Sequence, residues 1–310
     1  MNKSKPIVVV GSINMDLVVQ TPRIPVPGET IIGTGFTTTP GGKGANQAVA
    51  ASRLGYPTHM IGKVGRDVYG PALINNLARA GVTTAPIEKV DGPSGVAPIL
   101  IADNGQNSIV VVPGANGLVN PATINCHADL IRCAGMVLCQ LEIPIETILY
   151  LLALCAEAGV PVMLDPAPAA ALPETVWTQV AWFTPNETEA AFYLGESLSV
   201  ENGAKRLLAR GLKGLVLKRG SEGCFVAVTE GKAGWVPPFK VNVVDTVGAG
   251  DCFNAAFAVA QLESLQINQD PLAAARFASA AAAISVSRHG AQASMPSRAE
   301  VDEFLARNTQ

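Results

Sequence analysis

The sequence predicts an α/β protein built on a doubly wound, mostly parallel sheet with a small separate β-sheet lid. From residue 58 to residue 220, short apolar runs alternate with segments of helical period, which is typical of parallel strands joined by right-handed crossovers. Two segments, about 15–40 and about 95–113, instead carry alternating and β-branched residues with no helical period. We therefore expect one domain over 1–310, in which these two segments fold over an α/β core as a lid.

Composition narrows the class of protein. Of 310 residues, 48% are hydrophobic and 15% are charged, enough apolar side chain for a deep core and too little charge for a disordered chain. The net charge is −3 and no basic block occurs. Nucleic-acid binding would need such a block. We expect a small-molecule ligand and no nucleic-acid partner.

Cysteine usage and apolar runs indicate a cytoplasmic protein. Six cysteines are scattered without a CxxC pair, as expected for thiols in a reducing compartment. The N-terminus has too few apolar residues for a signal-peptide core. The longest apolar region, 136–158, contains Glu142, Pro144 and Glu146, so we expect no membrane span.

The first expected strand is the apolar run at 7–10, which ends at Gly11 and looks buried on both faces. Ligands of open α/β sheets bind beyond the carboxyl ends of strands. Asn14 and Asp16 follow that end and would face the same side of an extended chain. They offer a donor and acceptors to neighbouring hydroxyls, although an ordinary polar turn is the alternative.

Proline and turn residues support the prediction of the two lid segments. Four prolines interrupt residues 17–40, and residues 96–112 read as a hairpin with its turn at Asp103, Asn104 and Gly105. A small sheet of this kind is positioned to close over a ligand. Because an open hairpin edge invites a second strand, we expect a homodimer through the lid.

Between the lid segments lies a loop with three glycines: Gly41, Gly42 and Gly44. A helix is expected over 45–54. The loop is not a phosphate-binding P-loop, because Thr37 stands where its first glycine should be and a glycine follows Lys43. We expect backbone to approach a ligand here, with Lys43 and Asn46 as polar contacts; a plain glycine hinge is the alternative.

The alternating region then predicts strands at 59–64, 136–142, 162–165, 182–187 and 214–220, and helices at 71–81, 145–159, up to 192 and at 204–211. Later helices are expected at 273–284 and 299–306. Polar residues follow four of the strands: Glu142, Asp165, Asn186 with Glu187, and Arg219. Each alone is more often a helix cap, but four at one rim predict a shared cleft.

The stretch DTVGAGDCFN, residues 245–254, is the strongest single signal. We expect a buried strand over 241–245, a glycine turn and a helix over 253–262. Gly248, Ala249 and Gly250 would then lie at a helix N-terminus, where free N–H groups and the helix dipole attract anions. Asp251 in the first turn would be a base beside this anion hole. A helix cap with permissive glycines is the alternative.

Together these motifs resemble the ribokinase-like (PfkB) carbohydrate kinase family over essentially the full chain. Two signatures match in order and spacing, GGKGANQAVAA from Gly41 and DTVGAGDCFN from Asp245, and GSINMD, VPGET, GVAPI, QLE, PAPA, TPNETEA and HGAQAS support them. The resemblance implies a Rossmann-like core and transfer of the ATP γ-phosphoryl group to a sugar. Asp251 would be the general base, with Gly248, Ala249 and Gly250 as the anion hole.

The resemblance also implies a substrate site, with D-ribose phosphorylated at O5. Its residues would be Asn14, Asp16, Gly42, Lys43, Asn46, Glu142 and Asp251. Deoxyribose-specific relatives carry an apolar residue at the position of Asn14, whereas GVAPI resembles those same relatives. A 2-deoxyribose kinase, or another sugar or nucleoside kinase, is therefore the alternative. A non-catalytic sensor is a second alternative, against which the retained Asp251 speaks.

The resemblance further implies ATP, Mg²⁺ and a monovalent cation, K⁺, as cofactors. Asn186 and Glu187 match the motif that organises magnesium and phosphate, and Arg219, Gly220 and Gly250 fall where nucleotide is bound. Many relatives have a small or aliphatic residue at the position of Arg219. The cation site would be formed, mostly through backbone carbonyls, by Asp245, Val247, Ser285, Arg288, Gly290 and Ser294.

Overall fold

The computed structural model describes residues 5–229, 231–264 and 270–308. Its two sheets have the strand orders β13-β12-β11-β10-β9-β8-β1-β4-β5 and β3-β2-β6-β7. The strands of the large sheet are β1 (Ile7–Val10), β4 (Thr58–Gly65), β5 (Ile87–Val90), β8 (Met136–Gln140), β9 (Val162–Asp165), β10 (Trp182–Phe183), β11 (Gly214–Lys218), β12 (Cys224–Val228) and β13 (Ala233–Val236). From β10 to β5 all neighbours are parallel, which confirms the predicted fold class.

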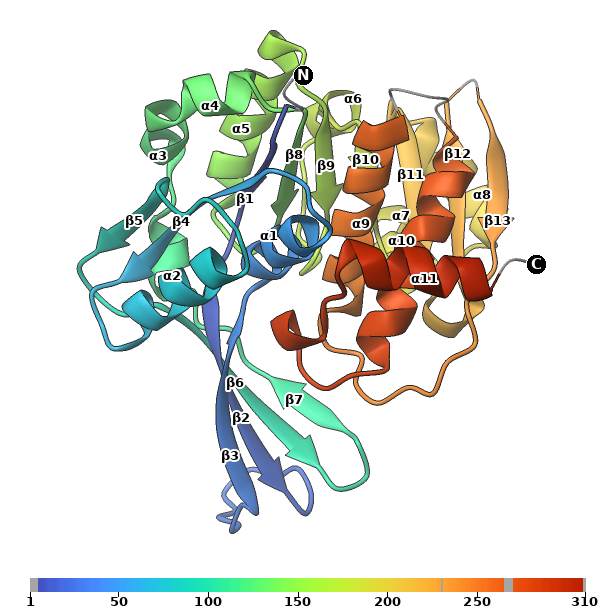
Figure 1. The fold of residues 1–310 in the computed structure, drawn as a ribbon. Coiled ribbons are helices and arrows are strands. Elements are labelled where there is room, and N and C mark those ends of the chain that lie inside the picture. The colour runs from blue at the N-terminus through green and yellow to red at the C-terminus, as the bar shows by residue number, and fades with distance from the viewer. Residues whose placement is uncertain (1–4, 230, 265–269, 309–310) are drawn as a thin grey trace.

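Helices cover the large sheet on both faces, and the small sheet projects from one end of it (Figure 1). The α-helices are α1 (Lys43–Arg53), α2 (Tyr69–Arg79), α3 (Pro121–Cys126), α4 (Ala128–Arg132), α5 (Ile145–Ala158), α6 (Thr175–Gln179), α7 (Glu187–Leu194), α8 (Val200–Leu208), α9 (Ala249–Ser264), α10 (Pro271–Val286) and α11 (Arg298–Arg307). Short 3₁₀ turns are η1 (Gly114–Leu118), η2 (Gly220–Glu222) and η3 (Gln292–Ser294). None of the helices in the described part of the chain is long and apolar enough to cross a membrane.

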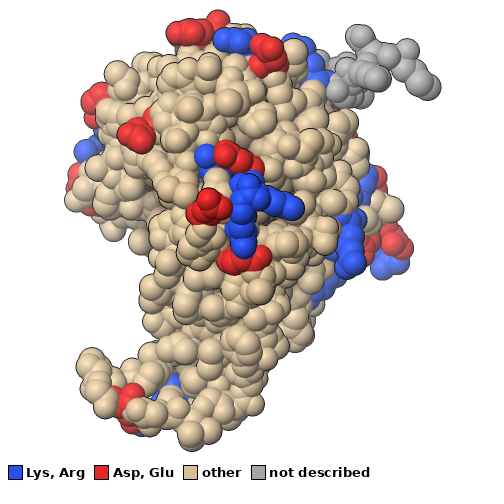
Figure 2. Space-filling view, turned by 90° about the vertical axis from the view of Figure 1, so that its left-hand side faces the viewer, with Lys and Arg blue, Asp and Glu red and all other residues tan. Residues whose placement is uncertain are grey.

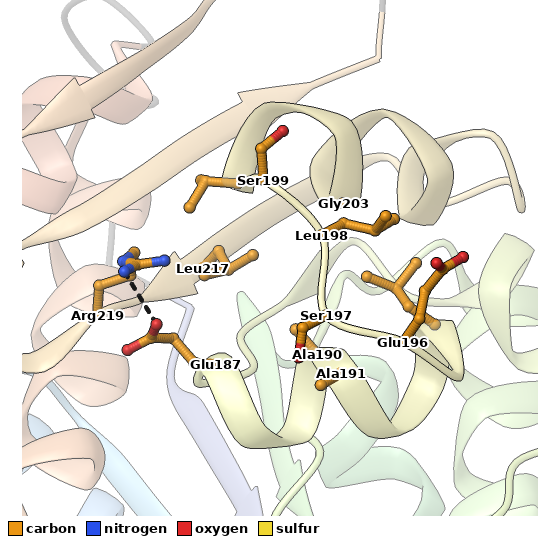
Figure 3. Close-up of a pocket in the computed structure, with 12 residues that line it drawn as sticks. Glu187, Ala190, Ala191, Glu196, Ser197, Leu198, Ser199, Gly203, Leu217 and Arg219 are labelled. Atoms are coloured by element: carbon orange, nitrogen blue, oxygen red, sulfur yellow. Dashed lines mark ion pairs between the residues drawn. The ribbon is translucent and has the colours of Figure 1, made fainter.

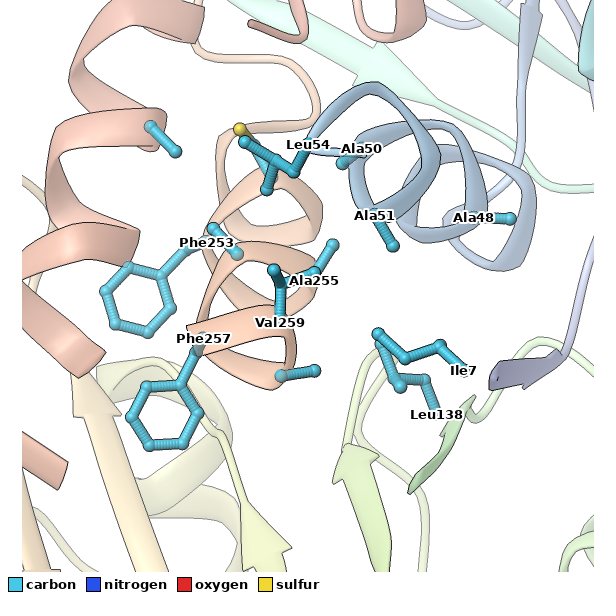
Figure 4. Close-up of a cluster of buried hydrophobic side chains, with 14 of the residues drawn as sticks. Ile7, Ala48, Ala50, Ala51, Leu54, Leu138, Phe253, Ala255, Phe257 and Val259 are labelled. Carbon is cyan, nitrogen blue, oxygen red and sulfur yellow. The ribbon is translucent and has the colours of Figure 1, made fainter. Parts of the chain in front are cut away.

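The first strand shows why its four residues are all apolar. Ile7 and Val9 belong to one buried cluster, and Val8 and Val10 belong to the other. Successive side chains of a strand point to opposite faces, so β1 is buried on both sides, as predicted. Figure 4 shows the first cluster, in which Ile7 lies near α1 and α9. This packing holds the N-terminal ends of α1 and α9 at the same rim.

The two predicted lid segments form one four-stranded sheet of β2 (Asn14–Thr21), β3 (Gly35–Gly41), β6 (Gly95–Ala102) and β7 (Asn107–Ile109). The hairpin turn is where the sequence predicts it, closed by a hydrogen bond from Gly105 N to Ala102 O of 2.8 Å. β2 begins at Asn14, so Asn14 and Asp16 lie within a strand and not in a polar turn.

The buried strand predicted at 241–245 is wrong. This segment forms no strand, and Val243 and Val244 are 58% and 41% exposed. Backbone hydrogen bonds from Val244 N and Asp245 N to Val286 O attach it to the end of α10. The edge of the sheet is occupied by β12 and β13, which add antiparallel to β11. Apolar composition alone did not distinguish an extended loop from a strand.

Candidate active site

Helix α9 carries the glycine turn at its start, as predicted. Gly248 has φ of 76°, a left-handed conformation that glycine adopts without strain. The helix begins at Ala249 and places Asp251 in its first turn. Asp251 is only 5% exposed, and free N–H groups at a helix start are where anions bind. A buried carboxylate therefore lies in the first turn of this helix.

Asp251 is held by two amides from α1. Asn46 Nδ2 donates to one carboxylate oxygen over 2.9 Å, and Gln47 Nε2 donates to the other over 3.1 Å. The same Gln47 nitrogen lies 3.1 Å from Asp165 Oδ2, and Lys218 Nζ donates to Asp165 Oδ1 over 3.2 Å. Gln47 and Lys218 were not predicted as site residues, since their chemistry appears only when the two helices and β11 converge.

A second polar group lies at the junction of the two sheets. Asp16 is 8% exposed, and a Cβ atom on Gly41 would lie 2.2 Å from its Oδ2. Glu142 accepts hydrogen bonds from Ser12 Oγ and from the Lys43 backbone N–H, the latter over 3.2 Å. The predicted sugar-site residues of the lid, of the glycine loop and of the β8 end are thus brought together.

The charged side chains of this buried polar group act on one another. Burial, together with repulsion from Glu142 and Asp251, raises the pKa of Asp16 to about 7. Burial raises the pKa of Asp251 to about 6, although Lys43 opposes that rise. For Lys43, burial lowers the pKa, but attraction to Asp251, Asp165 and Glu142 outweighs it and raises the pKa overall. A carboxylate with a pKa near neutrality is suited to accept a proton.

Asn186 and Glu187 lie at the start of α7, where Asn186 forms a parallel β-bridge with Lys218. Asn186 is exposed and caps α7, accepting from Glu189 N over 2.8 Å while its own backbone N–H donates to Glu189 Oε2. Glu187 pairs with Arg219 at 3.0 Å, beside a hollow of about 80 Å³ between α7 and α8 (Figure 3). Such a hollow is too small for a nucleotide. Gly220 follows in η2 with φ of 51°.

Glu189 was not predicted, yet it faces the charges of the cleft. Burial raises its pKa, while attraction to Lys218 and Lys43 opposes the rise. Its spacing of three from Asn186 is the capping-box signal, which could have drawn attention to it in the sequence.

The residues of the predicted cation site do converge. Asp245 accepts hydrogen bonds from Val247 N over 3.0 Å and from Gly290 N over 2.8 Å. Ser285 Oγ and Ser294 Oγ lie 2.7 Å apart and are buried. These contacts place the loop before α9 against the loop after α10, and they gather hard oxygen atoms there.

Arg288 takes a different direction, since its guanidinium pairs with Glu300 at 2.6 Å. If Arg288 contributes to a cation site, the contributing atom would therefore be its backbone carbonyl oxygen.

Comparison with known proteins defines the class to which this fold and cleft belong. The model of the pfkB family of carbohydrate kinases matches residues 4–298. The chain belongs to this family and is an enzyme that phosphorylates a carbohydrate.

Individual relatives agree over nearly the whole chain. It is 45% identical to the ribokinase of Bacillus subtilis (strain 168), covering 97% of this chain and 99% of that protein. It is 36% identical to the deoxyribokinase of Salmonella typhi, covering 97% and 99%. The structure of Arabidopsis thaliana ribokinase complexed with ribose and ATP superposes with a TM-score of 0.91, at 35% identity, covering 97% and 99%.

Proposed function

We propose that the protein transfers the γ-phosphoryl group of ATP to O5 of D-ribose, giving D-ribose 5-phosphate and ADP. The observation that carries the proposal is the buried Asp251 carboxylate, oriented by Asn46 and Gln47 at the start of α9. Similarity to ribokinases over 97% of the chain, at 45% identity for the Bacillus subtilis protein, supports ribose as the substrate.

In this mechanism Asp251 accepts the proton of the sugar hydroxyl as that oxygen bonds to the γ-phosphorus. The bond from phosphorus to the β–γ bridging oxygen breaks, and ADP leaves with its electron pair. Backbone N–H groups at Gly248, Ala249 and Gly250 would stabilise charge on the transferring group, with that of Ala249 leaving its 3.2 Å hydrogen bond to Thr246 O to do so. Lys218, whose Nζ would lie 3.5 Å from a Cβ atom on Gly250, is placed to add a positive charge there.

Mg²⁺ would be held here by few protein ligands. No group of three or more His, Cys, Asp or Glu side chains that could hold a metal occurs among the described residues. Mg²⁺ in kinases is usually bound by one or two carboxylates, waters and the substrate phosphates. Asn186 and Glu187 are the residues predicted for this role, and Glu189 and Asp165, both near Lys218, are further carboxylates that could share it. Magnesium would neutralise charge on the triphosphate.

K⁺ would bind between the loops before α9 and after α10, mostly through backbone carbonyls, since the hydrogen bonds of Asp245 to Val247 N and Gly290 N hold these two loops together. Its role would be to fix the glycine turn at Gly248.

The small sheet is proposed to close over the sugar and to form a homodimer interface. Ile32 and Phe36, at the β3 side, are 85% and 63% exposed, and Val110 beyond β7 is 60% exposed. Figure 2 shows the small sheet as a largely uncharged surface apart from its tip. Light scattering of the purified protein should give twice the chain mass; a monomeric mass would contradict the dimer.

The 2-deoxyribose kinase remains the second candidate, favoured by similarity to the Salmonella typhi deoxyribokinase. The deciding experiment measures ADP release with ATP, Mg²⁺ and K⁺ for D-ribose and 2-deoxy-D-ribose in parallel. We expect kcat/KM to favour ribose by tenfold or more. Equal or better use of deoxyribose would overturn the ribose assignment. Binding of ribose and ATP without turnover would favour the sensor.

A further inference from the structure

We infer that Asn116 is a specificity-determining residue that fixes the amide of Asn14 so that its N–H₂ end, and not its oxygen, faces the sugar. The inference rests on the proposed function, in which Asn14 contacts ribose. Asn116 hydrogen-bonds to the Ile13 backbone and to the Asn14 side chain, and it acts on the sugar only through Asn14, as a positioning residue. It lies in η1, just after the hairpin of the small sheet, and is 1% exposed.

A backbone N–H group, which can only donate, fixes the orientation of the Asn116 side-chain amide. The backbone N–H of Ile13 donates to Asn116 Oδ1 over 2.9 Å. A peptide N–H can only donate, so the end of Asn116 that meets it must be the oxygen. The Nδ2 end of Asn116 is thereby directed to Ile13 O at 3.3 Å and to Asn14 at 2.6 Å.

The orientation of Asn116 in turn fixes the orientation of the Asn14 amide. Asn116 Nδ2 carries only donors, so the atom of Asn14 that it meets must be the acceptor, Oδ1. Asn14 Nδ2 is then the end left for a ligand. Asn14 is 2% exposed, so little water reaches its N–H₂ group and an acceptor on a ligand would be a favourable partner. Asn14 therefore recognises a hydroxyl oxygen by donation, and a sugar lacking that hydroxyl loses the bond.

The backbone of β6 comes close enough to the pair to keep the two amides in contact. Asn14 lies opposite Gly95 in the pairing of β2 with β6. A Cβ atom on Gly95 would lie 2.1 Å from Asn116 Nδ2 and 2.3 Å from Asn14 Oδ1. Only glycine at this position permits the two amides to meet. The contact also ties the sugar-reading residue to the hairpin of the small sheet.

The experiment compares Asn116→Asp with wild type, using both sugars. The substitution keeps an acceptor for Ile13 N but replaces the Nδ2 donor by an oxygen, so Asn14 must turn its N–H₂ group toward the new carboxylate. We expect kcat/KM for ribose to fall at least tenfold and that for 2-deoxyribose less than threefold. The matched control is Asn120→Asp, the same chemical change at the N-cap of α3, where Asp is also a good cap.

A second variant keeps the inference testable if Asn116→Asp does not fold. Asn116→Ala removes the constraint without adding charge, and calorimetric binding of ribose without nucleotide gives a readout independent of turnover. The double variant tests the link to Asn14. When Asn14 is already alanine, adding Asn116→Ala should lower ribose affinity less than twofold, because no amide is left at position 14 to orient. Equal losses for both sugars, or additive losses in the double variant, would overturn the inference. Failure of wild type to use ribose would instead overturn the proposed function.

Discussion

Asn46 donates a hydrogen bond of 2.9 Å to Asp251, which lies 205 residues further along the chain. The orientation of the Asn46 amide is fixed by a second hydrogen bond, because Gln292 Nε2 donates to Asn46 Oδ1 over 3.1 Å. Asn46 thus presents its N–H₂ group to the Asp251 carboxylate. Such donors hold a carboxylate in one orientation before substrate arrives, which is how positioned bases contribute to rate.

Asp251→Asn should reduce kcat by about 10²- to 10⁴-fold, the range typical of a positioned general base. Ribose binding should stay measurable, because the other predicted sugar contacts remain. Steady-state kinetics and calorimetry check the two parts. Near-normal turnover in this variant would remove Asp251 from the role of base.

The rate should depend on pH through Asp251. Burial raises its pKa to about 6, and a base works only when deprotonated. We expect kcat/KM to rise with pH across the region around 6 and then to level off. A profile of kcat/KM against pH from 5 to 8 checks this, and a flat profile over that interval would contradict it.

Asp16→Asn should stabilise the protein at pH 8. The folded pKa of about 7 lies above the ordinary value of 3.8, so the folded chain binds more protons between these values and the free energy of unfolding falls as pH rises across them. Asparagine cannot ionise, so the variant escapes this loss of about 1–4 kcal/mol.

Urea denaturation at pH 4 and pH 8 measures the effect, and the gain should be absent at pH 4. Asp103→Asn, in the exposed hairpin turn, is the control and should change stability by less than about 0.5 kcal/mol. A gain of equal size at both pH values would show that charge burial is not its cause.

Gly41→Ala should weaken sugar binding. A Cβ atom there would lie 2.2–2.5 Å from the Asp16 carboxylate atoms, so Asp16 or the loop must move. We expect KM for ribose to rise about tenfold or more. Gly203→Ala on α8, where the nearest atom is the end of the flexible Leu194 side chain at 3.2 Å, should leave KM unchanged. Unchanged KM in both variants would speak against Asp16 as a sugar contact.

Activation by K⁺ should depend on the paired hydroxyls of Ser285 and Ser294. We expect higher rates in K⁺ than in Na⁺ or Cs⁺ at equal ionic strength, and a smaller K⁺ response in Ser294→Ala. Coupled assays in the three chlorides measure this. Equal rates in all three salts would contradict the proposed cation site.

Local signals in the sequence determined the fold class and the start of α9. Four consecutive apolar residues predict β1 because a strand buried on both faces needs them at every position. Gly248 and Asp251 predict the anion-binding helix start because glycine conformation and helix N-termini depend on neighbours in the chain. The family motifs at 41–51 and 245–254 added the reaction class, which comparison with the pfkB family confirmed.

Only the tertiary structure decided the contacts that orient these residues. Val243 and Val244 are as apolar as a buried strand, yet they lie exposed in a loop, because β12 and β13 occupy the sheet edge. Lys218 meets Asp165, and Asn116 meets Asn14 across 102 residues. Such pairs depend on strand register and on helix packing, and these are fixed by the burial of the whole core rather than by any short stretch of sequence.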